Sequence, residues 1–258
     1  MRKTGVCAIL LAAIGALLSV NAAGAKAPAL SGDGIIVGTE SAFPPFEFYN
    51  EKGELVGFDL DIAHLIGEKL GKEIVVSEMA FDGLIPALLS DKIDIIAAGL
   101  SVTEERAKKI NFSITYYSTP DAIVTKSGAK GFSEPEDLAG KVLSVQLGSI
   151  QDLYVSGLQG VKAVKRFKTV AECLYEVLYG RADATCLDGT VAVDQLAKTK
   201  DFAGALEIAM NITHPGVEGM ALGLSKKDPE LLEAVNAVLK DFIGTPAYEE
   251  MKAKWGIK

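Results

Sequence analysis

The sequence predicts an α/β protein of two lobes, each built on a mainly parallel sheet flanked by helices. Short apolar runs that suit buried strands alternate with segments whose apolar residues recur at helical spacing, which is typical of βαβ units. The 258 residues, 49% of them hydrophobic, suffice for two small cores. We expect the chain to cross between the lobes near 117–121 and near 212–219, and two crossings permit hinge closure over a cleft.

The first lobe is predicted from residues 34–117 together with 219–258. Ile62, Ile66 and Leu70 recur on one face of a segment that Gly71 ends, which predicts a helix over 59–70. The remaining elements predicted in this lobe, in chain order, are a strand at 35–37, a turn at 50–53, a strand at 74–76, a helix at 84–89, strands at 93–98 and 220–224, and helices at 231–242 and 248–255.

The second lobe is predicted from residues 122–212. Its predicted elements, in chain order, are a strand at 141–146, helices at 150–157 and 170–178, a turn at 180–181 and a strand at 182–187. Ligands of parallel α/β sheets bind at the carboxyl ends of the strands. Three segments at such ends are therefore expected to form the site: 39–46, 98–106 and 147–151.

The N-terminal residues predict a secretory signal peptide, 1–25. Arg2 and Lys3 precede an unbroken apolar run, 6–18, and the small residues of 22–25 follow. The run is shorter than the ~20 apolar residues of a spanning helix, which disfavours the alternative of a membrane anchor. We therefore expect cleavage near Ala25 and a periplasmic product.

Charge and cysteine content narrow the possible partners and bonds. The chain carries 26 basic and 34 acidic residues, and the predicted leader would take two of the basic ones away. Such an acidic protein is not expected to bind nucleic acid or anionic lipid. Beyond the leader lie Cys173 and Cys186; export would allow a disulfide between them, and two buried free thiols are the alternative.

Several short motifs follow one another along nearly the whole chain beyond the leader. They are Gly38-Thr39-Glu40 with Phe43-Pro44-Pro45-Phe46, Gly57-Phe58-Asp59-Leu60-Asp61, Phe81-Asp82-Gly83-Leu84, Gly99-Leu100-Ser101-Val102-Thr103 with Glu105-Arg106, Gly180-Arg181-Ala182-Asp183, and Lys254-Trp255-Gly256. Through them the chain resembles the extracellular solute-binding proteins of polar amino acid ABC transporters, family 3. The resemblance implies the type II periplasmic-binding-protein fold, and a monomeric receptor that closes around a free amino acid and docks on an inner-membrane permease.

The resemblance also implies which residues bind the zwitterionic head of the ligand. Arg106 matches the family's carboxylate-binding arginine, whose planar guanidinium suits a carboxylate. Asp188, which follows a predicted strand, matches the main ammonium partner. The alternatives are a surface position for Arg106 in the charged run 104–109 and a turn position for Asp188.

Smaller groups complete the head-binding part of the predicted site. Ser101 supplies a backbone N–H and a hydroxyl, with helix capping as its alternative role, and the Gly99 carbonyl is a further acceptor for the ammonium. The second lobe is expected to contribute Gln146, Ile150 and Gln151, and Gln151 is placed to reach the side chain of the ligand. Ile150 stands where the family often has a small hydroxyl residue, but backbone N–H groups at a helix start still bind a carboxylate.

Besides Gln151, four positions concern the side chain of the ligand. Phe43 and Phe81 match an aromatic pair that encloses it, with core packing as the alternative. Glu40 falls where members that prefer basic amino acids carry an acid, so arginine or lysine is the leading prediction. Ala98 stands where such members often place a serine, so one polar contact is expected to be missing.

Motifs of other functions do not occur in the sequence. It contains no phosphate loop, dinucleotide motif or nucleophile elbow, and His64 and His214 are far apart, so neither a cofactor nor a metal is expected. We expect a binding protein rather than an enzyme. The alternative is a cyclohexadienyl dehydratase-like enzyme acting on prephenate or arogenate, with Glu40 as general acid. A detached sensor module is a third interpretation.

Overall fold

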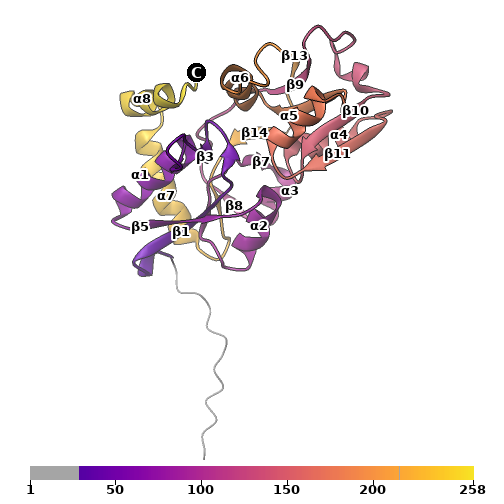
Figure 1. Ribbon diagram of the computed structural model, residues 1–258. Helices are drawn as coiled ribbons and strands as arrows, with labels where there is room; N and C mark the ends of the chain where they lie inside the picture. The colour runs from indigo at the N-terminus through magenta and orange to yellow at the C-terminus, as the bar shows by residue number, and fades with distance from the viewer. Residues whose placement is uncertain (1–28, 215) are drawn as a thin grey trace, which may run out of the picture.

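The computed structural model describes residues 29–214 and 216–258, and within them the chain forms two lobes (Figure 1). The predicted signal peptide lies outside the described residues. The sheet of lobe 1 consists, in spatial order, of β5 (Glu73–Glu78), β1 (Gly34–Thr39), β6 (Ile95–Ile96), β15 (Gly223–Leu224) and β8 (Asn111–Phe112). β1 is parallel to β5 and β6, whereas β15 is antiparallel to both of its neighbours. One strand therefore opposes the other four.

The sheet of lobe 2 repeats this arrangement. It consists, in spatial order, of β11 (Ala163–Phe167), β10 (Val142–Gln146), β12 (Ala184–Asp188), β9 (Asp121–Lys126) and β13 (Leu206–Ile212). β10 is parallel to β11 and β12, and β9 is antiparallel to both of its neighbours. The predicted class, a two-lobed α/β protein with mainly parallel sheets, is confirmed.

Helices flank both sheets, and the described residues also form a three-stranded and a two-stranded small sheet. In lobe 1 the helices are α1 (Phe58–Leu70), α2 (Phe81–Leu89), α3 (Glu104–Ala107), α7 (Pro229–Phe242) and α8 (Pro246–Trp255). In lobe 2 they are α4 (Ile150–Gly157), α5 (Val170–Leu178) and α6 (Gly189–Lys198). The small strands are β2 (Ala42–Phe43), β3 (Glu47–Tyr49), β4 (Leu55–Val56), β7 (Ser101–Thr103) and β14 (Val217–Met220), and short 3-10 turns occupy Ala29–Ser31 and Pro135–Leu138.

Local sequence accounts for several helix ends. α1 follows Gly57, whose φ is 147° and where an added Cβ would lie 2.0 Å from the carbonyl oxygen of Phe46, so only glycine fits there. The same helix ends at Gly71 in the left-handed conformation. α5 begins with a reciprocal capping box between Thr169 and Glu172. These ends coincide closely with those that the sequence predicts.

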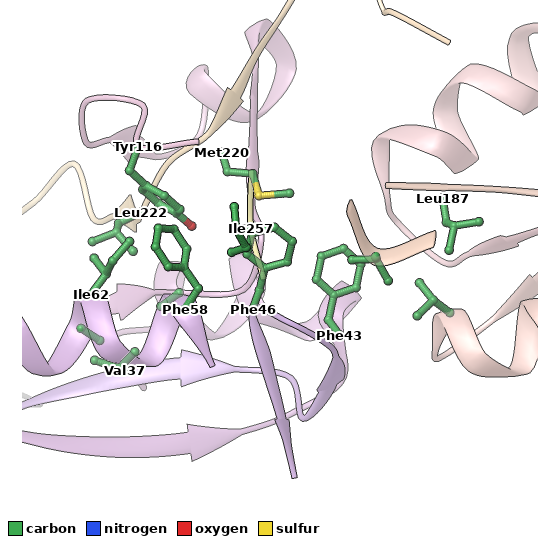
Figure 2. Close-up of a cluster of buried hydrophobic side chains, with 14 of the residues drawn as sticks. Val37, Phe43, Phe46, Phe58, Ile62, Tyr116, Leu187, Met220, Leu222 and Ile257 are labelled. Atoms are coloured by element: carbon green, nitrogen blue, oxygen red, sulfur yellow. The ribbon is translucent and has the colours of Figure 1, made fainter. Parts of the chain in front are cut away.

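An apolar cluster links the two lobes. Phe46 and Phe58 are fully buried in lobe 1, with ring centroids 6.3 Å apart. Figure 2 shows Phe43 at the edge of this group, extending toward Leu187 of lobe 2. Phe43 and Leu187 belong to the same cluster, so apolar packing continues across the cleft in this structure.

Two connecting segments join the lobes, and they run side by side. One leads from β8 to β9 and the other from β13 through β14 to β15. Tyr117 of the first and Met220 of the second form an isolated antiparallel bridge, in which the Met220 N–H donates to the Tyr117 carbonyl over 2.7 Å. The connection between the lobes is therefore a narrow pair of strands.

The cysteines beyond the predicted leader are not bridged. Cys173 lies on α5 and Cys186 on β12, and both are buried free thiols. Burial raises the pKa of both thiols, so the reactive thiolate is scarce at neutral pH. Within the described residues, no helix has the length and apolar character that crossing a bilayer requires.

Candidate functional site

A small cavity between the lobes brings together most of the residues that the sequence analysis selects. Lobe 1 and lobe 2 both contribute to its wall. Its lining consists of Phe43, Phe81, Gly99, Ser101, Arg106, Gln146, Ser149, Ile150, Gln151, Asp188 and Met220. The cavity measures about 20 Å³, close to what one water molecule needs. An amino acid can therefore enter only when the lobes separate.

Arg106 points into the cavity, away from its charged neighbours in the sequence. It lies on the short helix α3, which Thr103 caps by accepting a hydrogen bond from the Arg106 N–H. Its Nη1 donates to the Ser101 carbonyl over 2.7 Å, and its Nη2 donates across the cleft to the Gly148 carbonyl over 3.1 Å. Burial lowers the pKa of Arg106 to about 10, so the guanidinium stays charged at neutral pH.

Phe81 adds an aromatic face to this end of the cavity. The Arg106 guanidinium carbon lies 5.5 Å from the centre of the Phe81 ring, a distance at which a cation is attracted to the ring face. The adjacent Glu104 and Glu105 pair with exposed Lys108 at the surface. Glu104, Glu105 and Lys108 of the charged run 104–109 therefore lie at the surface, whereas Arg106 is available for an anionic group in the cleft.

Asp188 is both a helix cap and a cavity group. It ends β12 and caps α6, where its Oδ1 accepts hydrogen bonds from the N–H groups of Thr190 and Val191, at 2.9 and 3.1 Å. Among the described residues no group donates to its Oδ2. Burial, together with the nearby charge of Asp121, raises the pKa of Asp188 to about 8. A cation that enters the cavity would stabilise the ionised form.

Glu40 and Gln146 form a contact between the lobes. Glu40 follows β1 in lobe 1 and is 4% exposed, and Gln146 ends β10 in lobe 2. The Gln146 Nε2 donates to Glu40 Oε1 over 3.0 Å and to Oε2 over 2.8 Å, and also to the Lys168 carbonyl. Burial raises the pKa of Glu40 to about 7, and the bond from Gln146 partly offsets that effect. A carboxylate in this position suits a cationic partner.

The absence of a side chain at Gly99 allows the Phe43 ring to lie close to the backbone at this position. Its φ is +56°, and an added Cβ would lie 2.6 Å from Cε1 of Phe43, so a larger residue would displace the Phe43 ring. The Phe43 ring stacks on Phe46 at a centroid distance of 5.7 Å. The Gly99 N–H donates to Asp59 Oδ2 over 2.7 Å, which holds this backbone segment in place.

The remaining predicted residues differ in how far they reach the cavity. Ile150 begins α4, and the hydroxyl of the preceding Ser149 caps that helix by accepting from the Asp152 N–H. Gln151 lines the cavity, but its Nε2 donates to Asp121 Oδ1 over 2.8 Å. Ala98 is 1% exposed and packs in the apolar cluster with Leu84 instead of lining the cavity.

Asp121 and His214 form a buried pair that the sequence analysis does not select. Asp121 stands opposite Asp188 in the register of β9 and β12, and it is 3% exposed. Its Oδ2 bonds to His214 Nε2, and the His214 ring lies edge-on against Tyr154 at 4.5 Å. His214 is 93 positions from Asp121 in the sequence, so no local pattern could have paired them.

Raised carboxyl pKa values predict that stability depends on pH. Burial raises the pKa of Asp59 to about 6, of Glu40 to about 7 and of Asp188 to about 8. In the unfolded chain these groups have ordinary pKa values near 4. At pH values between the unfolded and the folded pKa, the folded protein therefore binds more protons than the unfolded chain. Their stabilising contribution is complete below about pH 4 and is lost as the pH rises to about 8.

We therefore expect the ligand-free protein to melt at a lower temperature at about pH 8 than at about pH 5. The Asp188→Asn variant should show a smaller difference, because asparagine caps a helix as well as aspartate but does not titrate. Scanning calorimetry at both pH values measures the effect. Identical pH dependence in the two proteins would show that Asp188 titrates normally.

The comparisons with known proteins agree with one another. The family described as bacterial extracellular solute-binding proteins, family 3, matches residues 35–258. The L-arginine-binding protein of Pseudomonas aeruginosa is 33% identical over 224 residues, which cover 85% of this chain and 86% of that protein. The arginine-binding extracellular protein ArtP of Bacillus subtilis is 34% identical over 224 residues, 86% of this chain and 85% of that protein. A solved ancestral arginine-binding protein bound to arginine is 37% identical, with a TM-score of 0.81, over 87% of this chain and 98% of that one.

Proposed function

The chain belongs to the bacterial extracellular solute-binding proteins, family 3, and from this premise we propose that it is the receptor of an ABC importer for a free basic amino acid, with L-arginine the first candidate. The two relatives described above are arginine-binding proteins by name, and the similar solved structure has arginine bound. These proteins are binding proteins rather than enzymes, which favours a receptor over the dehydratase alternative.

One observation carries the proposal: Arg106 of lobe 1 and Asp188 of lobe 2 line the same cavity. The α-carboxylate of the ligand bonds to the Arg106 guanidinium, and its α-ammonium bonds to Asp188 Oδ2. Both ligand groups lose water in the cleft, so each needs a charged partner. Because the partners belong to different lobes, the complete set of contacts exists only with the lobes together, and the ligand favours that state.

Glu40 supports a basic side chain in particular. In the present structure its carboxylate is held by the neutral amide of Gln146. A guanidinium that reaches Glu40 replaces this amide by a charged donor, and charge-assisted hydrogen bonds are about twice as strong as neutral ones. Glu40 does not itself line the cavity of Arg106 and Asp188, but it bonds to Gln146, which does. Phe43 and Phe81 line that cavity and are placed to enclose the alkyl part of the ligand.

The cellular setting and the motion follow from the same proposal. The chain works in the periplasm after cleavage near Ala25, as a monomer that delivers its ligand to an inner-membrane permease. The lobes, 34–117 with 219–258 and 122–212, close about the segments near 117–121 and 212–219. The side-by-side strands at Tyr117 and Met220 support this hinge, because few bonds must change when they bend.

Two measurements on the purified protein test the function. Mass spectrometry of the ligand released on denaturation should identify a basic amino acid, and titration calorimetry should give a micromolar or tighter dissociation constant for L-arginine, about −8 kcal/mol or more. Incubation with prephenate or arogenate should give no aromatic product. Turnover of either compound, with no binding of an amino acid, would show that the protein is an enzyme and not a receptor.

A further inference from the structure

A second cavity adjoins the small one on the side of the connecting segments. It measures about 290 Å³, close to the lower end of the range for small-molecule pockets, about 300–1,000 Å³. Four residues line both cavities: Ser101, Ile150, Asp188 and Met220. Asp188, the proposed partner of the ligand ammonium, therefore stands at the boundary between them.

The second cavity is acidic and partly polar. Asp121 and Asp188 contribute two buried carboxyl groups, and among the described residues of its lining the only other titratable side chain is that of His214, which bonds to Asp121. Ser118, Thr119 and Thr213 add hydroxyl groups, while Val217 and Ile212 are among the apolar groups of the wall. Two carboxyl groups with hydroxyl groups around them suit a cationic hydrogen-bond donor.

Hydrogen bonds between the lobes cross the other ends of the amino acid pocket. Behind the carboxylate position, Arg106 bonds across the cleft to the Gly148 carbonyl. Behind the side-chain position, Gln146 bonds across the cleft to Glu40. On the Asp188 side, the larger cavity shares lining residues with the amino acid pocket, so an extension of the ligand is accommodated at its α-nitrogen.

We propose that the cavity beside Asp188 is a second subsite, which takes the N-terminal residue of a dipeptide that ends in a basic amino acid. The C-terminal residue occupies the amino acid pocket, the peptide N–H donates to Asp188, and the terminal ammonium lies near Asp121. The inference rests on the proposed function, because it uses the same carboxylate and side-chain contacts. It extends the ligand class from free amino acids to short peptides.

Calorimetry with matched ligands tests the subsite. Glycyl-L-arginine should bind the wild-type protein within about 10-fold of L-arginine, because its ammonium gains charge-assisted hydrogen bonds in the second cavity. L-arginylglycine has the same composition but extends at the carboxyl end, and it should bind at least about 100-fold more weakly than L-arginine. N-acetyl-L-arginine, which lacks the ammonium, should bind at least about 10-fold more weakly than glycyl-L-arginine.

Variants of Val217 test whether the dipeptide binds in the second cavity. Val217 lies on β14 and lines only the second of the two cavities. Val217→Phe fills that cavity and should lower the affinity for glycyl-L-arginine at least about 10-fold, while the affinity for L-arginine changes less than about 3-fold. Val217→Ala should change the affinity for either ligand by less than about 3-fold. If L-arginine binds but glycyl-L-arginine does not, or if Val217→Phe leaves the dipeptide unaffected, the subsite is wrong and the receptor function stands. If neither ligand binds, the proposed function itself fails.

Discussion

Replacing Asp188 by asparagine is expected to lower the affinity for L-arginine by at least about 100-fold, the largest loss from any single cleft variant. In the proposed function, the change removes the buried carboxylate that faces the ligand ammonium and leaves that ammonium with a neutral partner. Asparagine retains the helix cap, since its side-chain oxygen still accepts from the Thr190 and Val191 N–H groups. Calorimetry gives the affinity, and circular dichroism confirms that the fold persists.

Asp228→Asn is the matched control for this variant. Asp228 caps α7 just as Asp188 caps α6, accepting a hydrogen bond from the Leu231 N–H, but it does not line either cavity of the cleft. It should leave L-arginine affinity within about 3-fold of the wild type. If Asp188→Asn also stays within that margin, Asp188 serves as a helix cap alone.

Replacing Glu40 by glutamine is expected to change specificity more than overall binding. L-arginine should lose about 10- to 100-fold in affinity, because its guanidinium no longer meets a carboxylate, whereas L-glutamine should change less than about 3-fold. The buried position of Glu40 strengthens the effect, since water screens its charge little. Competition calorimetry with both amino acids measures the ratio directly.

Glu73→Gln is the control for the loss of one negative charge. Glu73 is exposed at the start of β5 in the same lobe, away from the cleft, and its replacement should alter neither affinity. Equal losses for arginine and glutamine in the Glu40→Gln protein would show that Glu40 supports closure of the lobes through Gln146 and does not select the ligand.

Local sequence predicted the elements whose side chains repeat with a clear period. The helices over 150–157 and 170–178 are observed as α4 and α5 with the same bounds, because an apolar face and a capping residue mark each of them. The prediction omits β9, β11, β13 and α6. β11, for example, mixes Lys165 and Arg166 with apolar residues on a partly exposed edge, so its composition does not distinguish it from a loop.

The sequence by itself determined the fold class, the family resemblance and the candidate head-binding residues, because apolar periodicity and short motifs are properties of neighbouring positions. Only the tertiary structure decided which distant groups meet. The Glu40–Gln146 contact joins residues 106 positions apart, and the Asp121–Asp188 neighbourhood exists because β9 runs antiparallel beside β12. The burial that raises the pKa values of Glu40 and Asp188 likewise arises when the surrounding elements pack around the cleft and exclude water.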